Sequence, residues 1–285
     1  SDFSESISAA NEDATVGALY CKQMQTPKIL TLYLSNQILM DAISLRGAIA
    51  HEIVHYTIDQ NHLVLPRFLE EGLAIYLQTL IQPRAERNMV HSHLKDDPQI
   101  PLNPADDEFS QWNSVQKLSF YGGSYLFVRY LVQNFGENMV SDLLSNSGGW
   151  RERLEISALK ALGEFRNFKQ IFQDFTIARV INSLDYFANE KDLYRYYLLE
   201  GDFTEHAQSL NYQSRLTYRV LNKQAFSKLR PSDSVIIVEV TTLGEISVYK
   251  SNNYPSRHTV TAAIKGAVKS HSARLENQFI IAIYN

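Results

Sequence analysis

The chain has 285 residues, of which 45% are hydrophobic, so it can bury the core of one large domain or of two smaller ones. Its formal net charge is −4 and no basic stripe runs along it, which excludes nucleic acid and anionic membrane surfaces as expected partners. No apolar run reaches the roughly 18 residues that span a bilayer, and the single cysteine cannot form an intramolecular disulfide.

The N-terminal part predicts a loose arm followed by β structure. Residues 1–14 are polar and acidic. The chain begins with Ser rather than Met, so either a leader has been removed or the terminus has been trimmed, and of these we expect an exported protein, periplasmic or extracellular. Two short runs rich in β-prone residues follow at 16–23 and 28–35. They predict a hairpin or two neighbouring strands.

Two amphipathic helices are predicted next. Apolar residues recur at spacings of three and four from about 41 to 62. Pro66 then stands where a second helix, over 67–81, would begin. The stretch 82–110 is rich in Pro and Asp and has weak periodicity, so it predicts a long loop that is functional or mobile.

The remaining pattern predicts more helices and then a second domain. A helix is expected over 116–136, ended by a glycine, and two or three more follow to about residue 200. Short β-rich runs separated by turn residues come after them, which predicts an all-β, sandwich-like domain. The expected fold class is therefore α+β, with a small N-terminal β segment and a mostly helical domain over 1–201, followed by the β domain over 202–285.

The first predicted helix contains the run His51-Glu52-Ile53-Val54-His55. Residues four apart on an α-helix differ by about 40° around its axis, so both imidazoles project from one face. Nitrogens held in this way can bind one zinc ion at roughly 2.0–2.1 Å. Glu52 is placed to take a proton from a zinc-bound water, whose pKa the metal lowers to about 7. The alternative is a surface helix with two histidines on its polar face.

A third ligand must come from another element, because a catalytic zinc site usually has three protein ligands and one position for water. Glu70 and Glu71 stand in the first turn of the second predicted helix. A short turn would let this helix return antiparallel to the first and bring either carboxylate to the ion.

The motif H-E-x-x-H followed by F-L-E-E-G-L-A-I-Y resembles the gluzincin clan of zinc metallopeptidases, and within it the bacterial families related to aminopeptidase N. Their third ligand is the Glu directly before Gly in a W-L-x-E-G-x-A-like segment, which implies Glu71. Glu70 falls at the variable position, and we interpret it as a solvated acid in the first helical turn. Gly72 and Ala74 are expected to be small because the two zinc-bearing helices approach closely.

The run from Tyr121 to Gly136 resembles the Y-x-x-G/S helix of the same clan. The resemblance implies that the phenolic hydroxyl of Tyr121 donates to the oxyanion of the tetrahedral intermediate, with Tyr125 as the back-up. The alternative is that Tyr121 is one more packing tyrosine.

The resemblance covers roughly residues 16–185 and implies a zinc-dependent peptidase, with one Zn²⁺ per chain and peptide or protein substrates. The G-x-M-E-N segment that grips a free amino terminus in aminopeptidase N-like enzymes is missing from residues 15–45, which favours an endopeptidase or a narrow-substrate peptidase. The predicted strands could pair with an extended peptide. Two alternatives stay open: a non-catalytic binding or scaffold module that retains the metal, and a protein whose C-terminal β domain carries the function.

Two further histidines, His91 and His93, lie in the predicted loop beside Asp96 and Asp97. None of the usual ligand spacings occurs there, so we expect a solvated polar loop rather than a second metal site. The sequence has no G-x-S-x-G elbow and no Gly-rich phosphate loop, so serine-hydrolase and nucleotide-binding functions have no support.

Overall fold

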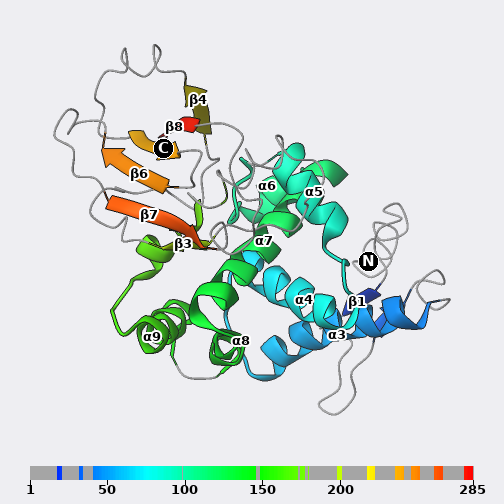
Figure 1. Ribbon diagram of the computed structural model, residues 1–285. Helices are drawn as coiled ribbons and strands as arrows, with labels where there is room; N and C mark the ends of the chain where they lie inside the picture. Colours follow the sequence, from blue (N-terminus) through cyan, green and yellow to red (C-terminus); the bar gives the residue numbers. More distant parts are fainter. Residues whose placement is uncertain are drawn as a thin grey trace.

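The computed structural model shows a helical part and, further along the chain, a β-sheet (Figure 1). The residues it describes are 18–20, 32–34, 41–97, 99–145, 148–172, 174–176, 179, 198–200, 217–221, 235–240, 245–250, 260–265 and 279–284. Between residues 41 and 176 the regular structure is helical, which agrees with the mostly helical domain that the sequence predicts. Among the described helices, none combines the length and apolarity that a membrane span requires.

Helices α3 (Ala42–Gln60) and α4 (Arg67–Ile81) lie side by side, and their bounds confirm the two helices predicted from periodicity (Figure 1). The turn between them includes His62, whose φ of 51° lies in the left-handed region. Two hydrogen-bonded side-chain pairs show that the helices run antiparallel: Ser44–Gln82 and His55–Glu70. One face of each helix therefore points at the other along their whole length.

The prediction of a long loop over 82–110 is wrong, because this segment contains α5 (Arg87–Lys95) and α6 (Asp106–Ser110). Val90 and Leu94 stand four residues apart on one face of α5, and both are buried. Met89 packs against the core only partly, and the polar residues Ser92 and His93 are buried beside the two apolar ones, so the sequence shows too little periodicity to reveal the helix. Packing against the rest of the fold, rather than local propensity, stabilises it.

Helix α7 (Ser114–Phe135) is the long helix predicted over 116–136. It begins with a capping box, in which the Asn113 side chain accepts from the backbone of Gln116 and the Gln116 side chain accepts in return. It ends at Gly136, whose φ of 87° suits a residue without a side chain.

Helices α4 and α5 both approach α7 at glycines. A Cβ on Gly72 of α4 would lie 2.4 Å from the backbone oxygen of Ser124, and a Cβ on Gly122 of α7 would lie 2.1 Å from the backbone oxygen of Met89. The expectation that Gly72 is small to let the two zinc-bearing helices meet is therefore wrong about the partner. The close approach is between α4 and α7, and it lies directly after the two carboxylates, Glu70 and Glu71, in the chain.

The core is completed by α8 (Asn138–Leu143), α9 (Trp150–Leu162) and the helical residues 168–172 and 174–176. Aromatic rings with centroids 4.8–6.5 Å apart join these elements to α4 and α7. The members of this cluster are Phe68, Phe127, Trp150, Phe168, Phe172 and Phe175. Because Phe68 lies in the first turn of α4, its burial in the cluster fixes the start of that helix.

Two strands precede the helices. Strands β1 (Ala18–Tyr20) and β2 (Leu32–Leu34) pair antiparallel, with Leu19 opposite Tyr33. The pairing confirms the two neighbouring strands predicted at 16–23 and 28–35.

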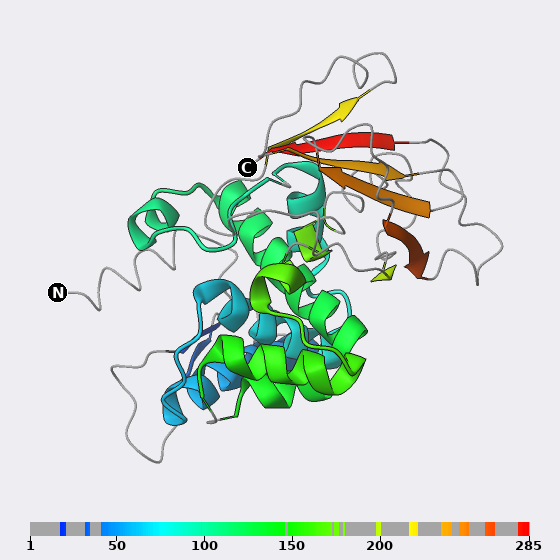
Figure 2. The ribbon, with the colours of Figure 1, turned by 90° about the vertical axis from the view of Figure 1, so that its left-hand side faces the viewer.

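Six strands further along the chain form one antiparallel sheet, in the order β3-β7-β6-β5-β8-β4 (Figure 2). They are β3 (Leu198–Glu200), β4 (Thr217–Leu221), β5 (Val235–Val240), β6 (Glu245–Lys250), β7 (Val260–Lys265) and β8 (Phe279–Tyr284). The segments that connect the strands lie outside the described residues. A separate sandwich-like domain over 202–285, and the boundary near 201, therefore stay predictions.

Candidate metal centre

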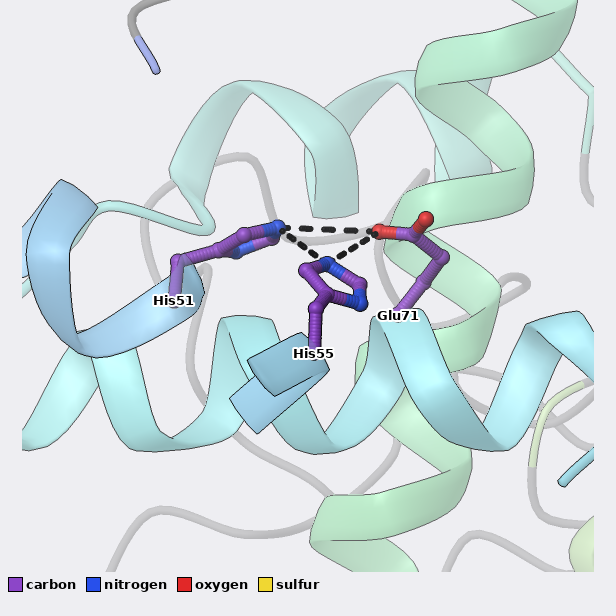
Figure 3. A group of neighbouring side chains, drawn as sticks. All are labelled: His51, His55 and Glu71. Carbon is purple, nitrogen blue, oxygen red and sulfur yellow. Dashed lines mark hydrogen bonds and ion pairs between the residues drawn. The ribbon is translucent and has the colours of Figure 1, made fainter. Parts of the chain in front are cut away.

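Three side chains on facing turns of α3 and α4 point toward one another: His51, His55 and Glu71 (Figure 3). The two Nε2 atoms are 3.2 Å apart. Oε2 of Glu71 lies 3.7 Å from Nε2 of His51 and 3.9 Å from Nε2 of His55. The side chains are 14–20% exposed, so the group is partly shielded but open to solvent. These are the three residues predicted as metal ligands.

The spacing of these atoms fits a zinc ion. Ligands at 2.0–2.1 Å in a tetrahedral arrangement stand about 3.3–3.4 Å apart. The observed separations of 3.2, 3.7 and 3.9 Å lie near this value, so small side-chain movements would complete the geometry. Two imidazoles and one carboxylate also form a common donor set of catalytic zinc sites, which keep a fourth position for water.

The neighbouring carboxylate, Glu70, holds His55 in place. Its Oε1 accepts a hydrogen bond of 2.8 Å from Nδ1 of His55. In the neutral imidazole that a metal would bind, this bond keeps the one proton on Nδ1 and leaves Nε2 with a lone pair that faces the other two ligands. A carboxylate behind a ligating histidine fixes the ring and raises its basicity. The interpretation of Glu70 as a solvated acid is therefore wrong.

Burial and charge shift the pKa values of all three residues. For His51, burial and the charge of His55 lower the pKa to about 3. For His55, burial alone would lower the pKa, but the hydrogen bond to Glu70 and the charges of Glu71, Glu70 and Glu52 raise it to about 9. Burial, with the charges of Glu70 and Glu52, raises the pKa of Glu71 to about 7 against the attraction of His55. The centre without metal therefore holds protons that a bound cation would displace.

Glu52, the predicted general base, lies on α3 and is only 6% exposed. Its charge acts on both His55 and Glu71, so its carboxylate belongs to the same electrostatic group as two of the three ligand residues. A carboxylate buried beside a metal position can hold and release a proton there.

Tyr121 lies on α7 and packs against the hydrophobic core. It is partly buried, and its ring stands 6.4 Å from that of Phe109 on α6. The guanidinium of Arg67 stacks 4.3 Å above the Phe109 ring. Arg67 is one helical turn before Glu71, and its charge opposes the rise in the pKa of that carboxyl. Phe109 therefore contacts both Tyr121 and Arg67, and Arg67 stands at the start of α4, the end of the helix that carries Glu71.

Tyr125, the back-up for the same role, has a structural position. It is 1% exposed, and its hydroxyl accepts a hydrogen bond of 2.9 Å from Nη1 of Arg129. Burial raises the pKa of the hydroxyl, and the charge of Arg129 opposes this. The side chain is therefore fixed inside the helical core.

The expectation that His91 and His93 occupy a solvated loop is wrong, because both lie on helix α5, and His93 departs from it most. This residue lies on α5, is fully buried, and its Nδ1 donates a hydrogen bond of 2.8 Å to the backbone oxygen of Ser119. A Cβ on Gly123 would lie 2.7 Å from the imidazole, so the glycine makes room for the ring. Burial, with the charge of Arg179, lowers the pKa of His93 to about 3, so it packs as a neutral side chain.

The functional residue that the motif alone missed is Glu70. The sequence does contain a signal for it, since a histidine that binds a metal through Nε2 needs an acceptor for the proton on Nδ1. The two adjacent acids at the start of α4 can supply one ligand and one acceptor. Assigning a separate role to each requires knowing which way the two side chains turn.

A family model described as the Peptidase MA superfamily matches residues 35–153. The match covers less than half of the chain and includes the His-Glu cluster, Glu52 and Tyr121. It supports a metallopeptidase-type family and a peptidase function, without the narrower relation to aminopeptidase N. No curated protein and no solved structure matches the chain.

Proposed function

We propose that this protein is a zinc-dependent peptidase that cleaves internal peptide bonds of peptide or protein substrates. The main support is that two imidazole nitrogens and one carboxylate oxygen lie within 3.9 Å of one another. A buried carboxylate, Glu52, lies on the helix that carries both histidines. The Peptidase MA match over the same residues supports a peptidase.

In this proposal His51, His55 and Glu71 hold the metal, and Glu70 orients His55. When bound, zinc lowers the pKa of a water molecule and polarises the scissile carbonyl. Glu52 would accept a proton from the attacking water and give it to the nitrogen of the leaving amine when the C–N bond breaks. Burial of Glu52 suits both transfers, because few competing water molecules surround the carboxylate.

Tyr121 is proposed to donate its hydroxyl proton in a hydrogen bond to the oxyanion that forms during attack. A positioned donor of this kind contributes about 2.7–4 kcal/mol to the transition state. Support comes from its partial exposure beside Phe109, the ring on which Arg67 stacks, whereas Tyr125 is fully enclosed.

The missing amino-terminus-binding segment supports internal cleavage over removal of N-terminal residues. An exported location likewise stays a proposal from the sequence.

The proposal is tested with a library of peptides whose amino termini are either free or acetylated, digested by the zinc-loaded protein and read by mass spectrometry. We expect internal cuts in acetylated peptides, and loss of these cuts in Glu52→Gln, which keeps the ligands but cannot accept the proton. Cleavage restricted to free N-terminal residues would contradict the endopeptidase assignment. A fully active Glu52→Gln protein would contradict the mechanism.

A further inference from the structure

His51, the other histidine of the centre, has a buried ring nitrogen with no well-aligned hydrogen-bond partner. Nδ1 of His51 is enclosed and makes no hydrogen bond of ordinary geometry. If Nε2 of His51 binds a metal, the neutral imidazole must carry its proton on Nδ1. A buried N–H without an acceptor costs about 1–3 kcal/mol, so a neighbouring acceptor is expected.

The neighbour is an amide on the facing helix. Gln78 stands two turns beyond Glu71 on the same side of α4, and its side chain interacts with the His51 ring. A Cβ on Gly47, one turn before His51 on α3, would lie 3.4 Å from Cγ of Gln78 and 2.6 Å from Oε1 of Gln82. The absence of a side chain at Gly47 therefore makes room for the two amides beside the histidine.

A chain of hydrogen bonds fixes which way the two amides point. Asp41, ionised at neutral pH, can only accept, so the hydroxyl of Ser44 donates to it. The oxygen of Ser44 then accepts from Nε2 of Gln82 at 2.9 Å. Oε1 of Gln82 in turn accepts from Nε2 of Gln78 at 3.1 Å. Because the amide nitrogen of Gln78 is used in this way, its oxygen is the atom left to face the Nδ1–H of His51.

We propose that Gln78 is a positioning residue for the metal centre: its side-chain oxygen accepts the Nδ1 proton of His51 and so keeps Nε2 available as the ligand. The inference rests on the proposed zinc function. In this arrangement each ligating histidine has a hydrogen-bond acceptor on α4. The acceptor of His55 is the charged carboxylate of Glu70, and the acceptor of His51 is the neutral amide of Gln78. The neutral amide orients His51 without adding a further negative charge to a site that already contains several carboxylates.

The test compares Gln78→Leu, which removes the acceptor, with Gln78→Glu, which keeps one. Zinc affinity is measured by competition with a chelator, and the Nδ1–H proton of His51 is followed by NMR after ¹⁵N-histidine labelling. Loss of a supporting acceptor typically weakens metal binding 10–100-fold. We expect this loss in Gln78→Leu, together with faster exchange of the Nδ1 proton, while Gln78→Glu stays within a few-fold of wild type. Gln60→Leu, an exposed change at the end of α3, is the matched control and should change neither.

Wild-type zinc affinity in Gln78→Leu would overturn the inference. An equal loss in Gln78→Leu and Gln78→Glu would also overturn it, because packing rather than the acceptor would then matter. Peptide hydrolysis is not a readout here. A protein that binds zinc and cuts no peptide would contradict the proposed function and leave the role of Gln78 intact.

Discussion

Glu70 and Glu71 are adjacent in the chain, yet they face opposite sides of the same histidine. Oε1 of Glu70 is 2.8 Å from Nδ1 of His55, and Oε2 of Glu71 is 3.9 Å from its Nε2. One step along α4 turns a side chain by about 100°, so consecutive acids can flank an imidazole that approaches from the neighbouring helix. The two carboxylates therefore have different roles.

Exchanging each acid in turn separates these roles. Glu71→Ala removes a ligand and should lower zinc affinity far more than Glu70→Ala, which removes only the support of His55 and should cost about 10–100-fold. Chelator competition measures both. Equal losses, or a larger loss in Glu70→Ala, would mean that the ligand has been assigned to the wrong residue.

The raised pKa of His55 predicts how stability without metal depends on pH. The pKa is about 9 in the folded protein and about 6.5 in an unfolded chain, so the folded state binds more protons between these values. The stabilisation is complete below pH 6.5 and is lost as the pH rises through 9. The thermal midpoint of the chelator-treated protein should therefore fall between pH 7 and pH 9.

Glu70→Gln provides the control for this pH dependence, because the amide removes the charge that holds the proton on His55. Its midpoint should fall less over the same pH range. A midpoint that falls as steeply in Glu70→Gln as in wild type would assign the effect to other groups.

The close contact between α4 and α7 predicts that one added methyl group at Gly72 lowers the stability of the fold. In Gly72→Ala the new Cβ would meet the backbone oxygen of Ser124 at 2.4 Å, so one helix must move. Overpacking of this kind costs about 1–3 kcal/mol. Chemical denaturation of the metal-free protein measures it. Gly149→Ala has no atom within 4 Å of the new Cβ and should be nearly neutral; similar stabilities for the two variants would contradict the close approach.

Tyr121→Phe tests the proposed oxyanion donor. It removes one hydroxyl and keeps the ring that packs near Phe109. Peptide hydrolysis should fall about 10²–10³-fold, mainly in kcat, with zinc content unchanged. Tyr125→Phe is the control because its hydroxyl is bound to Arg129 inside the core, and it should affect kcat much less. Near-full kcat in Tyr121→Phe would remove this residue from the mechanism.

The helices that carry the site could be predicted from the sequence because their signals are local. Pro66 marks the start of α4, Gly136 follows the end of α7, and His51 and His55 share a face by their spacing alone. Helix α5 could not be predicted, because the polar residue His93 occupies a position on its buried face and interrupts the apolar periodicity.

The interactions that connect different helices were also beyond the sequence. The partner of Gly72 depends on how α4 crosses α7, which no local pattern records. The role of Glu70 depends on the rotamers of two adjacent acids, and the role of Gln78 depends on a chain of hydrogen bonds that begins 37 positions earlier, at Asp41. Tertiary geometry decides all three.

The zinc content of His51→Ala and His55→Ala tests the central claim most directly. Elemental analysis of the purified wild-type protein should find about one equivalent of zinc, and each variant should lose it because two of the three ligands cannot hold the ion alone. His91→Ala, outside the cluster, should keep its zinc. A full equivalent of zinc in both His51→Ala and His55→Ala would place the metal elsewhere and contradict the account.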